Sequence, residues 1–259
     1  MNKKIVISYI VLVVIILLLG GFIYLDKFVL GKDEHTLTVI DDVSIDLSSF
    51  IQVSETLEKF DNAFNDANST YFGYFYNQKK LLASKMDSNV ALYVAAYGEL
   101  ERTNSPKVLP SGIVQSSFEK IFGKQLKYNP QNIEGGNFYN IPYSAETDSY
   151  TYTAQPIQKT YAPGYMAKNT KVTVGEEEIV VMRKIFYVEY IPNASGVITK
   201  ASIYKDATKN NKLAELALHN GTLRLSEVID KYGSKLLTYQ YTFKQRSVDD
   251  YSFYLLERK

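Results

Sequence analysis

The 259-residue sequence predicts an α+β fold that follows an N-terminal membrane-spanning helix. Three observations predict it: an uncharged apolar run at residues 5–25, apolar residues at helical spacing between residues 50 and 122, and alternating apolar residues after residue 128. We expect about three helices, followed by an antiparallel sheet that curls around one or more of them, as in cystatin-like or nuclear-transport-factor-2-like folds.

The first element is the apolar run at residues 5–25, which contains no charged side chain. About 20 such residues span the hydrocarbon layer of a bilayer as a helix. A cleaved signal peptide is the alternative, but Leu-Leu-Gly-Gly-Phe-Ile at residues 18–23 contains no small-x-small cleavage site. A lipid anchor on cysteine is excluded because the chain has no cysteine. The run therefore predicts one uncleaved transmembrane anchor.

The charges beside this run predict its orientation. Lys3 and Lys4 precede it, whereas acidic and basic residues are mixed after it. By the positive-inside rule, residues 1–4 are a cytoplasmic tail, residues 26–35 are a juxtamembrane linker, and residues 36–259 form one extracytoplasmic domain. Exported eukaryotic domains of this size usually contain disulfides. The absence of cysteine therefore indicates a bacterial protein, located in the cell membrane.

Three helices are expected in the first half of the domain. Asp87 or Ser88 is suited to cap a helix over residues 90–100, and Gly123 is suited to end a helix over residues 111–122. The helix that precedes them is indicated by apolar residues spaced three and four apart, namely Phe50, Val53, Leu57, Phe60 and Phe64.

After Tyr128 the apolar period approaches two, which is typical of strands. Residues 157–169 contain Pro163 and Gly164 and are expected to form a long loop. A short helix is expected at residues 226–232. Strands are expected at residues 150–154, 178–191, 197–204, 213–218, 236–244 and 251–257, the last two as a closing hairpin.

Composition excludes several kinds of chemistry. With a formal net charge of +1, the chain has no basic excess for nucleic-acid binding. The absence of cysteine excludes thiolate nucleophiles, Fe–S clusters and cysteine zinc sites. Only two histidines, His35 and His219, are present, and they form no metal-ligand motif. We therefore expect no metal, no cofactor and no nucleic-acid partner.

Candidate catalytic residues are few. Two Ser-x-x-Lys patterns occur, Ser117 with Lys120 and Ser202 with Lys205, but Lys-Thr-Gly is absent. Ser117 lies inside an expected helix and Ser202 inside an expected strand, so neither pattern predicts a catalytic site. Pairs of carboxylates brought together by the fold cannot be recognised from spacing, which leaves a glycosidase-type hydrolase open.

Tyrosine is the remaining unusual feature, with 22 residues against no tryptophan. Tyrosine offers contact area and a hydrogen-bonding tip, which suits recognition surfaces. It is also a favoured strand residue, so many of these side chains belong in the sheet. The candidate ligand-binding residues are Tyr71, Tyr74, Tyr76, Tyr150, Tyr152, Tyr161 and Tyr165.

Three segments carry a resemblance: Tyr-Phe-Gly-Tyr-Phe-Tyr at residues 71–76, Ser-Phe-Glu-Lys-Ile-Phe-Gly at residues 117–123, and the tyrosine-rich closing hairpin. In these segments the chain resembles uncharacterised single-span membrane proteins of low-GC Gram-positive bacteria. The resemblance implies a membrane location and implies no activity.

These observations favour a non-enzymatic module of the bacterial cell envelope that binds or scaffolds a protein or glycan while tethered to the lipid bilayer through residues 5–25. One alternative is an envelope hydrolase that uses Asp and Glu carboxylates. Another is an accessory subunit of a membrane complex.

Overall fold

The computed structural model describes residues 47–66, 69–100, 105–135, 140–153, 161–248 and 250–259. It confirms the α+β class, and all of these residues belong to one unit of the chain. Within this part of the chain, no helix is long and apolar enough to cross a membrane. The predicted tail at residues 1–4, anchor at residues 5–25 and linker at residues 26–35 lie outside the described residues.

The three helices predicted for the first half are confirmed as α2 (Leu47–Phe64), α3 (Ser88–Tyr97) and α4 (Ser111–Phe122). The Asp87 side chain accepts hydrogen bonds from the backbone N–H groups of Asn89 and Val90, at 2.8 and 3.3 Å, and so caps α3. At the end of α4, Gly123 has φ +56°, and a Cβ there would lie 2.6 Å from the Arg246 side chain. Glycine at this position therefore ends the helix and permits close packing against the sheet.

The main sheet has seven strands, and every pairing in it is antiparallel. Its order is β1-β12-β11-β8-β9-β10, and β7 pairs with the other side of β8. The strands are β1 (Lys80–Leu82), β7 (Gly164–Val174), β8 (Glu178–Pro192), β9 (Ile198–Tyr204), β10 (Lys212–Ala217), β11 (Leu237–Ser247) and β12 (Asp250–Arg258).

Shorter elements complete the described fold. One small sheet contains β2 (Lys107–Pro110), β6 (Ser149–Tyr152) and β5 (Tyr143–Ser144), and a second contains β3 (Ile133–Glu134) and β4 (Asn140–Ile141). The 3-10 helices are η2 (Phe75–Asn77), η3 (Ala83–Lys85) and η4 (Gly123–Gln125). The fourth α-helix, α5 (Leu225–Tyr232), confirms the short helix predicted in the second half.

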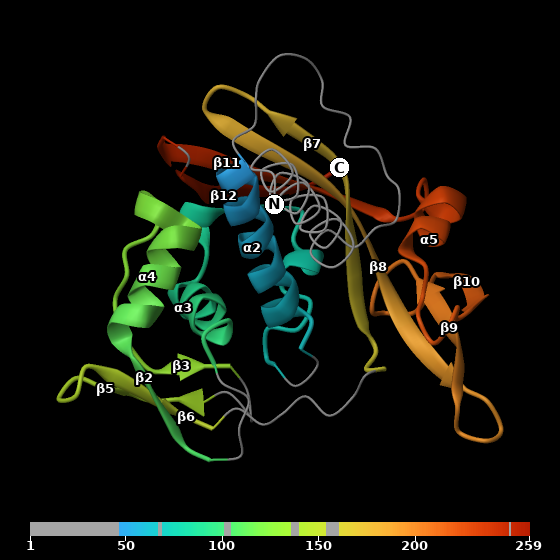
Figure 1. The fold of residues 1–259 in the computed structure, drawn as a ribbon, viewed down its shortest axis with the longest axis horizontal. Helices are drawn as coiled ribbons and strands as arrows, with labels where there is room; N and C mark the ends of the chain where they lie inside the picture. Colours follow the sequence, from blue (N-terminus) through green and yellow to red (C-terminus); the bar gives the residue numbers. More distant parts are fainter. Residues whose placement is uncertain (1–46, 67–68, 101–104, 136–139, 154–160, 249) are drawn as a thin grey trace, which may run out of the picture. The chain divides into compact units, whose positions relative to one another are not determined.

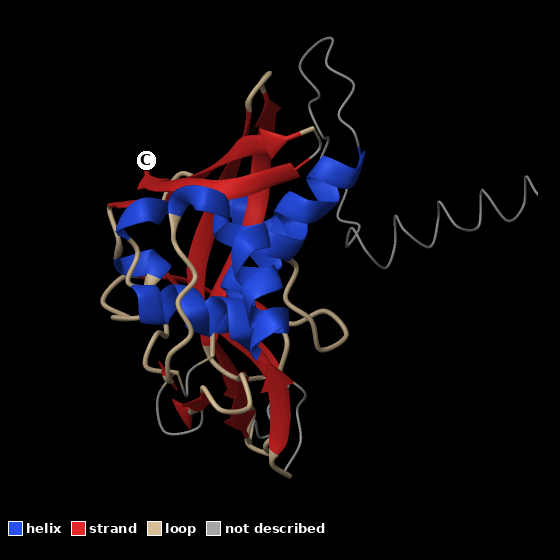
Figure 2. Ribbon diagram, turned by 90° about the vertical axis from the view of Figure 1, so that its left-hand side faces the viewer, coloured by secondary structure: helices blue, strands red, loops and turns tan. Residues whose placement is uncertain are grey.

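Helices α2, α3 and α4 cover one face of the main sheet (Figure 1). Figure 2 shows them grouped in front of the strands. On this face lie the alternate residues of β11, from Leu237 to Phe243, and aromatic rings bridge the two layers. The ring of Phe60 on α2 lies 5.0 Å from that of Phe253 on β12. The larger hydrophobic core therefore lies between the helices and the sheet.

A second core lies on the opposite face of the sheet. Ile185 and Tyr187 belong to the larger core, whereas Phe186 and Val188 pack with α5 residues such as Val228. Successive strand residues point to opposite faces, so the end of β8 is buried on both sides. α5 covers this face of the sheet, and side chains of the edge strand β10 such as Leu213 pack against the same core (Figure 1).

β8 changes its neighbour part-way along its length. On the side away from β7, Ile185 pairs with Leu237, the first residue of β11, and Tyr187 pairs with Tyr204, the last residue of β9. Both neighbours run antiparallel to β8, so β9 and β11 follow each other in one direction. Residues 205–236 connect β9 to β11 and contain the edge strand β10 and the helix α5. We call this point the fork.

The long loop predicted over residues 157–169 is wrong at its end, because residues 164–169 belong to β7. Residues 154–160 lie outside the described part. Among the described strands β7 pairs only with β8, and much of it is solvent-exposed, so it needs no strict apolar alternation. Lys168 and Lys171 on this edge, with a bulge between Asn169 and Lys171, are typical of a strand that resists further pairing.

Candidate functional site

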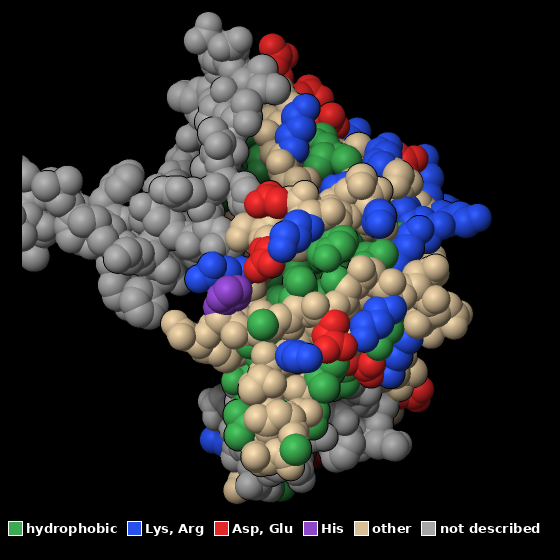
Figure 3. Space-filling view, turned by 90° about the vertical axis from the view of Figure 1, so that its right-hand side faces the viewer, with side chains coloured by type: hydrophobic (Ala, Val, Ile, Leu, Met, Phe, Trp, Pro, Cys, Tyr) green, Lys and Arg blue, Asp and Glu red, His purple; other side chains and the backbone are tan. Residues whose placement is uncertain are grey.

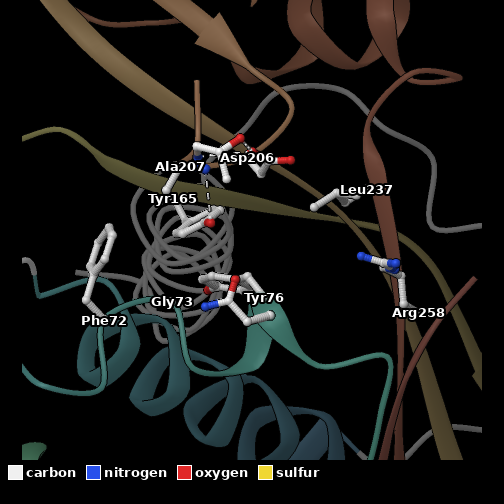
Figure 4. A pocket seen from close by; sticks show the side chains of 10 residues that line it. Phe72, Gly73, Tyr76, Tyr165, Asp206, Ala207, Leu237 and Arg258 are labelled. Atoms are coloured by element: carbon white, nitrogen blue, oxygen red, sulfur yellow. Dashed lines mark hydrogen bonds between the residues drawn. The ribbon is translucent and has the colours of Figure 1, made fainter. Parts of the chain in front are cut away.

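Two adjoining pockets open at the fork and share Asp206, Leu237 and Arg258. The first, which we call the tyrosine pocket, has a volume of about 370 Å³ and is shown in Figure 4. The second, the lysine pocket, measures about 660 Å³. Together they form the fork groove. The tyrosine pocket is lined by Phe72, Gly73, Tyr76, Asn77, Tyr165, Asp206, Ala207, Thr208, Leu237 and Arg258, and the lysine pocket by Lys205, Asp206, Asn211, Leu213, Ser234, Lys235, Leu236, Leu237, Arg258 and Lys259.

The groove exists because the strand ladder is interrupted at the fork. β11 begins at Leu237 and β9 ends just before Lys205, so the chain turns away from the sheet at both places. Arg258 is the last residue of β12 and pairs with Tyr239 of β11. In Figure 4 its side chain enters the tyrosine pocket from the side opposite Phe72. Five separate segments of the chain thus meet around one cavity.

Tyr76 and Tyr165 form the aromatic wall of the tyrosine pocket, with ring centroids 4.3 Å apart. The amide of Asn65 holds Tyr165 by accepting from its backbone N–H at 2.5 Å and donating to its carbonyl at 2.6 Å. The turn before η2 approaches closely because Gly73 has φ +68°, and a Cβ there would lie 3.1 Å from the Tyr165 ring. The wall is therefore fixed before any ligand binds.

Hydrogen bonds also fix the polar tips of this wall. The Tyr165 hydroxyl accepts from the backbone N–H of Ala207 at 3.1 Å, a bond drawn in Figure 4. The Tyr239 hydroxyl donates to the Tyr76 carbonyl at 2.7 Å. Burial raises the pKa of Tyr165, so its hydroxyl stays neutral at physiological pH.

Asp206 is the one carboxylate side chain among the residues that line the two pockets, and it forms hydrogen bonds within the chain. It accepts hydrogen bonds from the backbone N–H of Thr208, at 3.0 Å, and from the Thr208 hydroxyl. This pattern is an Asx turn, which shapes the loop after β9. The cationic side chains of the groove therefore outnumber its carboxylate side chains.

The seven candidate tyrosines do not form one patch. Only Tyr76 and Tyr165 line the groove. Tyr71 packs on Tyr93 and accepts a hydrogen bond from the Asn89 amide at 2.5 Å. Tyr74 lies against Phe64, with ring centroids 5.5 Å apart. These two stabilise the packing of α2 and α3.

The other three candidates lie elsewhere. Tyr150 and Tyr152 are buried on β6, and the Tyr150 hydroxyl lies 3.3 Å from that of Tyr128. Tyr161 is 37% exposed, and its ring meets the edge of Tyr190 at 5.2 Å. The structure thus places most of these tyrosines in packing roles, which strand and core positions equally favour.

A buried ion pair lies beside the groove. Asp61 on α2 accepts two parallel hydrogen bonds from Arg183 on β8, and Tyr76 donates to the same carboxylate at 3.3 Å. Burial disfavours the guanidinium charge, but Asp61 outweighs it, so the pKa of Arg183 lies above its ordinary value. The pair joins the helical layer to the sheet and supports Tyr76 from behind.

The structure also places the two serines considered above. The Ser117 hydroxyl accepts from Lys59 Nζ at 2.7 Å, and that ammonium also lies 2.7 Å from a Glu99 carboxylate oxygen. Lys59 on α2 thus bonds both to Ser117 on α4 and to Glu99, and these contacts join the helices. Ser202 is buried within β9. Neither serine belongs to the fork groove.

Acidic residues do not gather in the described part of the chain into a cluster suited to hold a metal ion. Among the side chains that line the fork groove, Asp206 is the one carboxylate. The groove therefore combines an aromatic wall with cationic side chains.

Comparison of the chain with protein-family models, with curated proteins and with solved structures found no match.

Sequence reasoning missed Asp206, Leu237 and Arg258, which join the two pockets. One signal was available: the run predicted as a strand at residues 178–191 is much longer than its neighbours in the sequence. A strand of that length is longer than most neighbouring strands, so two strands can pair with it end to end along one edge. The backbone of the long strand is unpaired where those two strands meet. Asp206-Ala-Thr208 also fits an Asx turn directly after a strand.

Proposed function

We propose that this protein is a membrane-anchored extracytoplasmic binding module of the bacterial cell envelope, and that its ligand occupies the fork groove. The anchor at residues 5–25, the cytoplasmic N-terminus and the extracytoplasmic domain are part of this proposal. A sheet curled around α2 in a cystatin-like or nuclear-transport-factor-2-like manner is part of it as well, although fold alone carries no function.

One observation carries the proposal: a cavity of about 370 Å³ whose aromatic wall and polar tips are fixed by bonds within the chain. Ligand sites are commonly cavities of about 300–1,000 Å³ with apolar walls and a few convergent polar groups. Fixed walls reduce the entropy lost on binding, so a site of this kind gains affinity without rearrangement.

The two rival functions make different demands. An envelope hydrolase needs two carboxylates facing the bond that is cleaved, and the groove offers Asp206 alone. An accessory subunit of a membrane complex needs association through the anchor and no ligand in the groove. A binding module needs only the groove, which makes it the function that this geometry favours.

The test blocks the groove without changing charge. Asn77 is exposed, lines the tyrosine pocket and lies at the end of η2, so Asn77→Trp would place a large ring over the cavity. Asn210→Trp is the matched control, because Asn210 is equally exposed and lines neither pocket. The full chain in mild detergent is mixed with sedimentable cell-envelope material from a low-GC Gram-positive bacterium, and the bound fraction is measured.

We expect the unmodified chain and Asn210→Trp to sediment equally with the envelope material and Asn77→Trp to remain largely in solution. Circular dichroism of all three proteins checks that the fold is intact. Equal sedimentation of the three proteins, or none by any of them, would contradict a binding role for the groove. Release of soluble fragments from the envelope by the unmodified chain would support the hydrolase instead.

A further inference from the structure

Three of the four cations that line the fork groove have no carboxylate partner among the described residues. Lys205, Lys235 and Arg258 line it, and none of them forms an ion pair with a carboxylate among the residues that the structure describes. Other cations nearby are paired: Lys209 with Glu189, and Lys259 with Glu257. The three unpaired charges therefore belong to the groove itself.

Asp206 supplies the one carboxylate side chain of the groove. Asp206 accepts hydrogen bonds from Thr208 in its Asx turn and keeps its negative charge, but this single charge offsets only one of the three cations. Arg258 lies close enough to Tyr239 to influence its pKa. Burial raises the pKa of Tyr239, and the positive charge of Arg258 opposes this rise. Figure 3 shows Lys and Arg side chains spread over the face formed by β9, β10 and α5, interspersed with Asp and Glu side chains and with areas of hydrophobic surface.

Three cations around one opening attract an anion that carries more than one negative charge. A guanidinium presents a planar pair of donors that matches phosphate oxygens, and two ammonium groups add point charges that can follow the remaining oxygens. A single carboxylate would leave most of this charge unbalanced. Phosphate is therefore the group that the lysine pocket and Arg258 are best suited to hold.

Arg258 also lines the tyrosine pocket, so a phosphate held there lies next to the aromatic wall. That wall offers ring faces and edges of Phe72, Tyr76 and Tyr165, together with the polar side chains of Asn77 and Thr208. Flat apolar surface next to hydrogen-bonding groups suits a compact polyhydroxylated body. A volume of about 370 Å³ limits that body to roughly one sugar or polyol unit.

We propose that the groove recognises a sugar phosphate or polyol phosphate, with the phosphate on Arg258, Lys205 and Lys235 and the hydroxylated body against Tyr76 and Tyr165. This inference rests on the proposed binding function and names its ligand class. A free phosphate ester and one unit of a phosphate-linked envelope polymer present the same chemistry to the groove.

The experiment measures binding to the full chain in mild detergent by isothermal titration calorimetry. Four probes are compared: glycerol 3-phosphate, glucose 1-phosphate, glucose, and a purified glycerol-phosphate polymer. Arg258→Gln, Lys205→Ala and Lys235→Ala each remove one proposed contact. Lys127→Ala is the charge-matched control, since Lys127 is exposed and lines neither pocket.

We expect phosphate-bearing probes to bind, glucose not to bind, and each groove variant to weaken binding about tenfold, the effect of losing one charge-assisted hydrogen bond. Lys127→Ala should bind as the unmodified chain does, and added salt should weaken binding. Binding of the polymer alone identifies the linked form as the ligand. Binding of the single esters without the polymer identifies the free ester, and binding of both shows that one phosphate-bearing unit is sufficient for recognition.

Three outcomes would overturn the inference: no binding of any phosphate probe, equal binding of glucose and glucose 1-phosphate, or equal weakening by Lys127→Ala and the groove variants. The sedimentation test separates these failures from failure of the proposed function. If Asn77→Trp abolishes envelope binding while no phosphate probe binds, the groove is a binding site for another chemical class. If both tests fail, the groove has no binding role.

Discussion

Asp61 Oδ1 and Oδ2 accept parallel hydrogen bonds from the two terminal nitrogens of Arg183, at 2.9 and 2.6 Å. Arg183 occupies the place of an apolar residue in the buried row of β8, between Val181 and Ile185. Its side chain is only 6% exposed, so the guanidinium depends on Asp61 for its charge balance. This one contact ties α2 to the centre of the sheet.

Breaking this pair should be costly. Asp61→Asn keeps the shape of the side chain and removes its charge, which leaves Arg183 buried without a counter-charge. We expect the free energy of unfolding to fall by about 3 kcal/mol, the lower end of the range for broken buried pairs, because the Asp61 side chain is 31% exposed. Denaturant titration followed by circular dichroism measures the loss.

The control for this substitution is Glu58→Gln on an exposed position of the same helix, which should change stability by less than about 0.5 kcal/mol. Combining Asp61→Leu with Arg183→Met should restore most of the loss, since both charges are then absent. Equal stability of Asp61→Asn and the unmodified protein would show that the pair contributes nothing.

Ser117 should matter for stability and not for chemistry. Ser117→Ala removes the hydroxyl that accepts from Lys59, and we expect the free energy of unfolding to fall by about 1 kcal/mol. Ser116→Ala, one residue away and exposed, is the control. Covalent labelling of Ser117 by a serine-directed fluorophosphonate probe would be the contrary result, because it requires an activated hydroxyl.

Alkaline conditions should unfold the protein. Burial raises the pKa of Tyr76, Tyr239 and Tyr241 above the ordinary value near 10, so the folded chain keeps protons that the unfolded chain releases. This stability is fully present below about pH 10 and is lost as the pH rises towards the folded pKa values. Tyrosinate absorbance, recorded without interference because tryptophan is absent, should rise together with loss of circular dichroism. Ionisation of all tyrosines near pH 10 with the fold intact would contradict this expectation.

The hydrogen bond between Ser111 and Asp148 should stabilise the protein at neutral pH and lose this effect in acid. The Ser111 hydroxyl donates to Asp148 at 2.5 Å and Tyr143 donates at 2.8 Å, and together they lower the pKa of this carboxyl. Such stability is present above the unfolded value of about 3.9 and is lost as the pH falls through the folded pKa. The stability difference between Ser111→Ala and the unmodified protein should therefore shrink below about pH 4, whereas Ser116→Ala should show little difference at any pH. A constant difference would indicate that the hydroxyl acts only through packing.

Local patterns made much of the fold predictable. α3 and α4 could be bounded from Asp87 and Gly123, because cap residues act within a few positions of the helix end. The alternation in β11 predicted its buried face, since a half-buried strand exposes every second residue. β7 was missed from residue 164 because Lys168, Asn169 and Thr170 on an edge strand carry no such alternation.

The groove could be predicted only in part. Tyr76 and Tyr165 were among the candidate residues, but tyrosine serves equally well in a core, and Tyr150 does so. Arg258 meets them only through the register of β12 on β11, and Leu237 meets Ile185 across 52 positions of the chain. Such non-local pairings leave no local pattern in the sequence.

The position of β8 between two strands and two cores determines where the protein unfolds locally. Its backbone is hydrogen-bonded to β7 on one side and to β11 or β9 on the other along most of its length, so its central amides can exchange with solvent only when both cores separate. β10 and α5 are attached through β9 and the smaller core alone. We therefore expect the amides of β10 and α5 to exchange with solvent faster than those at the centre of β8.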